Sequence, residues 1–236
     1  MLFQTEPQEP ALTMRTNQKE NIMRRIDKYR PTTFEDVVGN KKTIDRIYRA
    51  IDDNDGFGGL VFMLTGQTGN GKTLLADIMA GYIDGELYRP NCTKEAETAA
   101  MIDQIRRDVK QCSMFSNQSV YVFDEADKLH PSNIANLKTA IDQIDRRRKE
   151  NLPCKVTVIF TSAKTKEQLT SIQQGHWDEL CTRCITCKLG FLPEELDRYF
   201  AALTGGKITD ISKRIRVQSM RAAWEYIEEN GIDIVE

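Results

Sequence analysis

The stretch of this chain with the clearest chemistry is GQTGNGKT at residues 66–73, which fits the pattern G-x-x-x-x-G-K-[ST]. Its glycines let backbone N–H groups curl around a polyphosphate, and the N-terminus of the helix that follows adds partial positive charge. Lys72 can neutralise the outer phosphates, and the Thr73 hydroxyl can bind Mg²⁺. The stretch therefore predicts a polyphosphate site, with a purely structural glycine turn as the weaker alternative.

A pair of adjacent acidic residues, Asp124 and Glu125, lies in the stretch VYVFDEAD at residues 120–127. Asp124 follows an apolar run, so its carboxylate lies at a strand end and can reach the shell of a Mg²⁺ ion. Glu125 points elsewhere and can polarise an attacking water. An acidic pair alone is weak support, because strand ends are commonly polar. About 50 residues separate Lys72 from Asp124, so we expect the acid-bearing strand to lie beside the strand that precedes GQTGNGKT.

Three cysteines at an even spacing of three, Cys181, Cys184 and Cys187, raise the possibility of a metal site. Zinc needs four converging ligands, and this stretch supplies three. The remaining candidates are Cys112, Cys154 and His176, and their spacing recommends none of them. In an extended chain, Cys184 and Cys187 point to opposite faces. We therefore interpret the cysteines as small core residues.

Apolar runs alternate with helical patterns through most of the chain. Strands are expected at 60–65, 86–90, 119–123, 155–162 and 184–191, and helices at 41–51, 72–83, about 95–111 and 132–146. The runs are apolar throughout, which predicts a parallel sheet covered on both faces. The predicted domains are a mobile tail at 1–20, an α/β domain at 21–191 and a small helical domain at 192–236.

The composition is that of an ordinary globular protein, with 40% apolar residues and a net charge of −2. No stretch has the pattern of a signal peptide or approaches the roughly 18 apolar residues that span a membrane. We therefore expect a cytoplasmic protein (in the host cytoplasm if the source is viral) with reduced thiols. A basic run at residues 146–149, expected in the loop before the fourth strand, is a modest signal for DNA contact.

Taken in order, the motifs resemble those of AAA+ clamp-loader ATPases. DKYRPTTFEDVVGNKKTIDRIYRAI (27–51) resembles the N-terminal box of that family, with its Y-R-P and V-V-G elements. The likeness continues through GQTGNGKT, DEAD and CTRC (181–184), which looks like the S-R-C motif of the family, to QSMRAAWEYI (218–227), which resembles the arginine-bearing helix of the lid. The resemblance covers about residues 22–230. It implies a P-loop NTPase fold, a three-layer αβα sandwich with a five-stranded parallel sheet, followed by a small α-helical lid.

The resemblance also implies an ATP site with Mg²⁺. The residues that would border the adenine are Tyr29, Arg30, Pro31, Val37 and Val38. The residues that would hold the phosphates are Gly66, Gly69, Asn70, Gly71, Lys72, Thr73 and Leu74. Thr73 and Asp124 would bind the metal, and Glu125 would activate water.

Three further roles come from the same resemblance. Ser162 falls where the family usually has a polar sensor, most often Asn. Arg221 would reach the γ-phosphate from the lid of the same subunit. Arg183 would be an arginine finger inserted into the ATP site of a neighbouring subunit, where its guanidinium stabilises the charge on the transferred phosphoryl group. Such a finger has no use in a monomer, so the motif predicts an oligomer.

The expected partners are other AAA+ subunits, DNA and a sliding clamp, to which Leu129 and Ile134 are candidates for contact. Clamp-loader subunits usually carry a further helical collar domain, whereas this sequence ends at the lid. We expect assembly through AAA+ contacts alone, a collar-bearing partner, or a different role. The alternatives are a helicase loader or other AAA+ remodeller of DNA complexes, and an ATP-gated binding module without hydrolysis. The short side chain of Ser162 leaves the last of these open.

Overall fold

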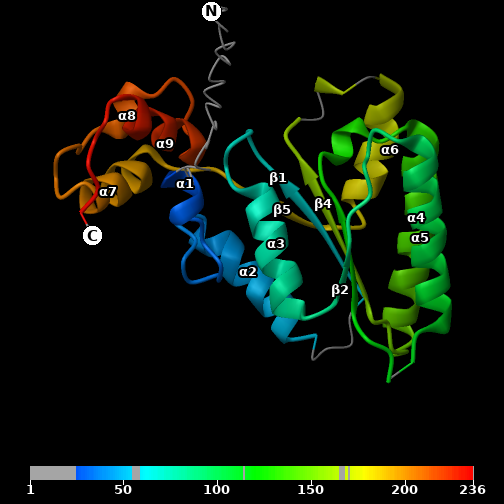
Figure 1. The fold of residues 1–236 in the computed structure, drawn as a ribbon. Coiled ribbons are helices and arrows are strands. Elements are labelled where there is room, and N and C mark those ends of the chain that lie inside the picture. Colours follow the sequence, from blue (N-terminus) through cyan, green and yellow to red (C-terminus); the bar gives the residue numbers. More distant parts are fainter. Residues whose placement is uncertain (1–24, 55–58, 114, 165–167, 170, 236) are drawn as a thin grey trace, which may run out of the picture.

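Five parallel strands form the sheet at the centre of the fold (Figure 1). The computed structural model describes residues 25–54, 59–113, 115–164, 168–169 and 171–235, so the predicted tail lies outside it. The strands are β1 (Leu60–Thr65), β2 (Glu86–Tyr88), β3 (Ser119–Phe123), β4 (Val156–Ser162) and β5 (Ile185–Lys188), in the order β2-β3-β4-β1-β5. The predicted five-stranded parallel sheet is confirmed.

The position of β4 differs from the expectation. It lies between β1 and β3, with Thr65 opposite Ser162 on one side and Phe123 opposite Phe160 on the other. The prediction that the acid-bearing strand lies beside the strand before GQTGNGKT is therefore wrong. The length of chain between two motifs allows either arrangement, because a later strand can insert between two earlier ones. The carboxyl end of β4 consequently sits between the glycine-rich loop and the acidic pair.

Helices cover both faces of the sheet, which completes the three-layer sandwich. Residues of α2 (Lys41–Asp52) and α3 (Lys72–Ile83) pack on one face, and residues of α4 (Glu95–Gln111), α5 (Pro131–Lys149) and α6 (Ser171–Cys181) pack on the other. The strand residues alternate between the two cores, as a pleated strand requires. In the part of the chain that the structure describes, no helix combines the length and the apolar character needed to cross a membrane.

The basic run at residues 146–149 lies in the last turn of α5 and not in a loop, which corrects the expectation. Arg and Lys are good helix formers, and their charges are favourable next to the carbonyl end of a helix. The Arg147 guanidinium donates to the backbone oxygens of Cys112 and Pro153, each at 2.8 Å, and so ties two loops to the helix. Arg147 therefore has a structural role in this run.

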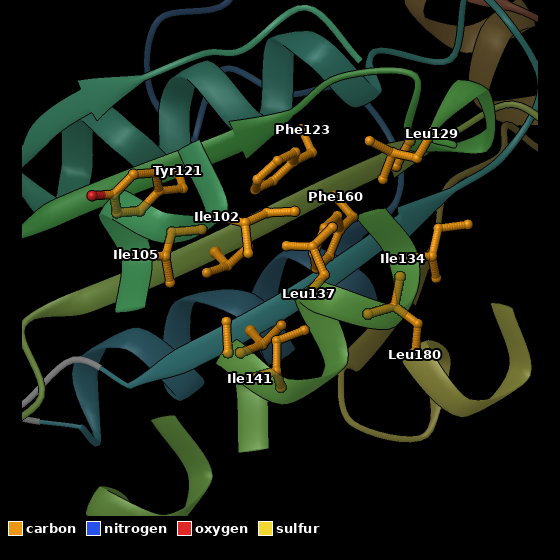
Figure 2. Packing of buried hydrophobic residues seen from close by; sticks show 14 of the residues in the cluster. Ile102, Ile105, Tyr121, Phe123, Leu129, Ile134, Leu137, Ile141, Phe160 and Leu180 are labelled. Atoms are coloured by element: carbon orange, nitrogen blue, oxygen red, sulfur yellow. The ribbon is translucent and has the colours of Figure 1, made fainter. Parts of the chain in front are cut away.

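The larger core lies between the sheet and α4, α5 and α6 (Figure 2). Phe123 and Phe160 stack at its centre with ring centroids 5.3 Å apart. Leu129 and Ile134 belong to the same core and are each 1% exposed. The prediction that these two side chains contact a sliding clamp is wrong, because both are buried in the core between the sheet and the helices.

A third core holds the C-terminal helices α7 (Pro193–Leu203), α8 (Ile211–Arg214) and α9 (Met220–Glu229). Its centre includes Phe200 and Trp224, whose rings meet edge to face. Tyr29, which follows α1 (Arg25–Lys28), packs against this core from the other end of the described chain. The helical lid is present, whereas its boundary at residue 191 stays a prediction.

Replacing Phe160 by alanine is expected to lower the free energy of unfolding by about 3–5 kcal/mol, because the change removes a fully buried ring and leaves a cavity. Phe115 is 98% exposed, and its replacement by alanine is expected to change stability by less than about 0.5 kcal/mol. Denaturant unfolding of the two variants beside the parent protein measures both values. Equal effects of the two substitutions would contradict the position of the core.

Candidate nucleotide-binding site

A cavity of about 730 Å³ lies where the carboxyl ends of the strands meet the lid. Open α/β sheets bind ligands at this edge, because the loops that follow parallel strands gather there. The predicted site residues that line the cavity are Tyr29, Arg30, Pro31, Val37, Val38, Gly69, Asn70, Gly71, Lys72, Thr73, Leu74, Asp124, Glu125 and Arg221. The fold thus brings together four separate parts of the chain around one cavity: the N-terminal segment, the glycine-rich loop, the acidic pair and the lid.

The glycine-rich loop needs its glycines for two separate reasons. Gly66, Gly69 and Gly71 have φ values of 150°, 87° and 79°, which L side chains rarely adopt. A Cβ at Gly66 would lie 2.2 Å from the carbonyl oxygen of Leu189, where the chain leaves β5. Gly66 itself does not line the cavity. It fixes the start of the loop against the sheet.

Lys72 is a buried cation that lies against the loop it belongs to. Its Nζ donates to the carbonyl oxygens of Gly66 at 2.8 Å and Gln67 at 2.9 Å. Burial lowers the pKa of the Lys72 ammonium, the Asp124 carboxylate opposes this shift, and the positive charge of Arg221 adds to it. Two cations, Lys72 and Arg221, therefore face one cavity, and an anionic ligand would relieve the cost of keeping them there.

Thr73 and Asp124 form a pair of oxygen ligands at the inner end of the cavity. The Thr73 hydroxyl lies 3.0 Å and 3.1 Å from the two carboxylate oxygens of Asp124. Mg²⁺ prefers hard oxygen ligands and is usually held by one or two carboxylates together with substrate phosphates. The pair therefore fits Mg²⁺, with Thr73 and Asp124 as the residues that would hold it.

Thr161, which is not among the predicted site residues, lines the same cavity. Its hydroxyl donates to Asp124 Oδ1 at 2.6 Å and accepts from the backbone N–H of Glu125 at 3.0 Å. Ser162, the predicted sensor, does not line the cavity: its hydroxyl donates to the Lys164 carbonyl at 3.1 Å. Neighbouring residues of a strand face opposite sides of the sheet, so the Thr161 hydroxyl reaches the site and the hydroxyl of the next residue, Ser162, does not.

Glu125 stands at a turn in the chain beside the cavity. Its φ is 55°, and it caps the short 3₁₀ helix η1 (Ala126–Lys128). Its side chain is 61% exposed and forms an ion pair with Lys128. The hydrogen bond to Glu125 raises the pKa of the Lys128 ammonium. Glu125 is therefore accessible to a water molecule in the cavity, and Lys128 restrains it.

The outer end of the cavity is lined by aromatic rings. Tyr29 stacks on Trp224 with centroids 5.4 Å apart and planes 17° from parallel. Phe191 and Tyr199 line the same region. Trp224 was not predicted, although it lies three residues after Arg221 on one helix, a spacing that places both on one face.

Arg183 does not line the cavity. It lies between α6 and β5, where its Nε donates to Asp142 Oδ1 at 2.7 Å and its Nη1 donates to the Glu179 carbonyl at 2.6 Å. The hydrogen bond to Asp142 raises the pKa of the guanidinium. Arg183 is therefore a fixed cation on the surface of the chain, away from the chain's own site.

The cysteines take the positions expected of core residues. Cys184 packs against the core on the α4–α6 face, and Cys187 belongs to the core on the α2–α3 face. The prediction that these two point to opposite faces is confirmed. Burial raises the pKa of the Cys181 thiol to about 11 and that of the Cys184 thiol further. Both thiols are therefore protonated at neutral pH and are poor nucleophiles or metal ligands.

Comparisons with known proteins agree with this geometry. Residues 62–176 match the family model described as "ATPase family associated with various cellular activities (AAA)". The replication factor C small subunit of Natronomonas pharaonis is 30% identical over 134 residues, which are 55% of this chain and 40% of that protein. Replication factor C subunit 4 of Saccharomyces cerevisiae is 30% identical over 112 residues, which are 44% of this chain and 33% of that protein. The chain thus matches well under half the length of these relatives.

Two solved structures show the same fold at low identity. The replication initiator DnaA, bound to AMPPCP and single-stranded DNA, has a TM-score of 0.55 and 12% identity, with 86% of this chain and 65% of that chain covered. The RuvB branch migration motor of Thermotoga maritima has a TM-score of 0.52 and 17% identity, with 87% and 74% covered. These structures show that the fold is shared, and the family match over residues 62–176 and the partial similarity to replication factor C subunits make the chain similar to AAA+ ATPases of the clamp-loader type.

Proposed function

We propose that this chain is a Mg²⁺-dependent ATPase that works as one subunit of an AAA+ oligomer in DNA replication. Its most specific role is that of a clamp-loader subunit, which uses ATP binding and hydrolysis to place a sliding clamp on DNA. The relatives named replication factor C support this role. The observation that carries the proposal is one cavity lined by the glycine-rich loop with Lys72, the Thr73–Asp124 pair, Glu125 and Arg221.

Each part of the site has a distinct task in hydrolysis. The loop N–H groups and Lys72 hold the phosphates, and Arg221 reaches the terminal phosphate from the lid. Mg²⁺ bound by Thr73 and Asp124 would neutralise charge on the phosphate oxygens. The Glu125 carboxylate is exposed at the cavity and can accept a hydrogen bond from the attacking water. The stacked rings of Tyr29 and Trp224 offer an apolar surface at the base end of the cavity.

Arg183 supports the assembly part of the proposal. Its guanidinium is held by Asp142 and a backbone carbonyl at the surface, and its side chain is 29% exposed. An arginine fixed in this way is ready to enter the site of a neighbouring subunit, where it would stabilise the charge of the transferred phosphoryl group. The site of each chain is then active only when another chain supplies this residue.

Replacing Arg183 by alanine is expected to lower kcat by about 10³-fold or more, the range for arginine fingers, while ATP binding is retained. In the parent protein, the turnover per subunit should rise with protein concentration, because assembly completes the site. Steady-state ATPase assays over a range of concentrations measure both effects. Arg146→Ala is the matched control, since Arg146 is an exposed arginine on α5 outside the cavity. Turnover that is independent of concentration would contradict a finger supplied by a neighbour.

Replacing Glu125 by glutamine is expected to lower kcat by at least about 100-fold, because the amide cannot act as a base. The phosphate and metal ligands remain, so the variant should keep ATP bound and stay assembled. This trapped state also serves to identify the partner, by purification of the variant with ATP and Mg²⁺ from the native source. Recovery of a sliding clamp or a collar-bearing subunit supports clamp loading, whereas a hexameric helicase would replace it with helicase loading. Normal hydrolysis in the variant would remove Glu125 from its proposed role.

A further inference from the structure

One hydroxyl group joins both acidic residues of the candidate site to the neighbouring strand. Thr161 is the penultimate residue of β4 and is 1% exposed. Its Oγ1 lies 2.6 Å from Asp124 Oδ1 and 3.0 Å from the backbone nitrogen of Glu125. The residue that would bind the metal and the residue that would activate water thus share a single partner.

The direction of these two hydrogen bonds is fixed by chemistry. A hydroxyl has one proton to donate and lone pairs to accept with, a backbone N–H can only donate, and an ionised carboxylate can only accept. Thr161 must therefore give its proton to Asp124 and accept from Glu125. The hydroxyl cannot rotate without losing one bond and leaving a buried polar group unpaired, which is costly.

The sheet brings the three residues together. Phe123 of β3 lies opposite Phe160 of β4, so the next residues, Asp124 and Thr161, are neighbours across the two strands. Asp124 lies two positions after Val122, and Thr161 lies two positions after Ile159, and both of these earlier residues belong to the core beneath α3. Asp124 and Thr161 therefore face the same side of the sheet as Thr73, which lies in the first turn of α3. The Asp124 carboxylate thereby receives hydroxyls from two directions, Thr73 and Thr161.

The same end of β4 also contacts the glycine-rich loop. The N–H of Gly66 donates to the carbonyl oxygen of Ser162 at 3.3 Å, and Thr65 pairs with Ser162 in the sheet. Successive residues of one strand therefore hold the start of the phosphate loop by a backbone oxygen and the acidic pair by a side-chain hydroxyl. The distance between the phosphate loop and the acids is set by this strand end.

We infer that Thr161 is a positioning residue that holds Asp124 at the metal position and Glu125 at the water position through one hydroxyl. The inference rests on the proposed function and adds to it a residue outside the predicted site. Outer partners that orient metal-binding residues typically contribute about 10- to 100-fold to metal affinity or activity. Threonine serves here because its hydroxyl makes both bonds and its branched side chain suits a strand.

The test compares Thr161→Val, which keeps the shape and removes the hydroxyl, with Thr161→Ser, which keeps the hydroxyl. Thr157→Val is the matched control, because Thr157 is equally buried at the other end of β4. The first measurement is the affinity for a fluorescent ATP analogue, with excess EDTA and over a range of Mg²⁺ concentrations. In Thr161→Val, the Mg²⁺ concentration for half-maximal effect should rise about 10- to 100-fold, and the affinity in EDTA should not change.

The second measurement is the ATPase rate, with kcat separated from KM. Thr161→Val should lower kcat more than it raises KM, and Thr161→Ser and Thr157→Val should behave as the parent protein does. A Thr161→Val protein with unchanged Mg²⁺ dependence and kcat would overturn the inference. So would a Thr161→Ser protein as impaired as Thr161→Val, because the methyl group would then be what matters.

The experiment also distinguishes a failure of folding in Thr161→Val and a failure of ATP hydrolysis in the parent protein from a failure of the inference. If Thr161→Val does not fold, as judged by thermal melting, Thr161→Ala is measured in its place with the same expected result. If the parent protein binds the analogue but does not hydrolyse ATP, the proposed hydrolysis fails. The Mg²⁺ dependence of binding still tests Thr161 in that case, because it does not need turnover.

Discussion

The parallel pairing of β1, β4 and β3 sets the distances within the candidate site. Each of the three strands ends at the same edge of the sheet. The phosphate loop follows β1, the acidic pair follows β3, and Thr161 lies at the end of β4 between them. Backbone hydrogen bonds fix the register, and the buried rings of Phe123 and Phe160 hold β3 against β4. A slip by one residue would turn Thr161 away from Asp124, since every side chain would change faces. The core therefore has a direct role in the geometry of the site.

The cavity at the carboxyl edge of the sheet holds both cationic and acidic side chains, which suits a ligand that carries negative and positive charges. Lys72 is 9% exposed and is satisfied by two carbonyl oxygens of its own loop, and Arg221 adds a second cation nearby. Asp124 and Glu125 face the same cavity from the sheet. A nucleotide phosphate chain with a divalent cation matches both groups, because the phosphates meet the cations and the metal meets the carboxylate. Each set of charges alone would be costly to keep together at the end of an apolar sheet.

Local patterns in the sequence were sufficient for the strands, the glycine-rich loop and the acidic pair, since each depends on residues close together in the chain. The order of the strands in the sheet could not be predicted from local patterns, because it depends on contacts between residues far apart in the chain. The place of β4 in the sheet depends on which strands pair, and nothing in the spacing from Lys72 to Asp124 specifies it. Thr161 lines the cavity and Ser162 does not, and the sequence alone did not show this difference because the face of a strand residue depends on register. Leu129 and Ile134 were misplaced because an apolar residue at the start of a helix can face a core or a partner, and only packing decides between them.

Helix α9 of the lid borders the candidate site at both ends of the cavity. A Cβ at Gly69 would lie 3.0 Å from both Arg221 Cβ and Ser219 Oγ, so the phosphate loop and the first turn of α9 are in close contact. At the other end of the cavity, Tyr29 from the N-terminal segment stacks on Trp224 of the same helix. A ligand that fills the cavity must therefore touch α9 and the sheet together, and its loss removes contacts from both. Arg183 does not line this cavity and is bonded to Asp142 of α5. In the proposed oligomer, the position of Arg183 relative to a neighbouring site would depend on how the lid and the sheet domain of that neighbour are held, so nucleotide occupancy in one subunit would alter the contact made by the next.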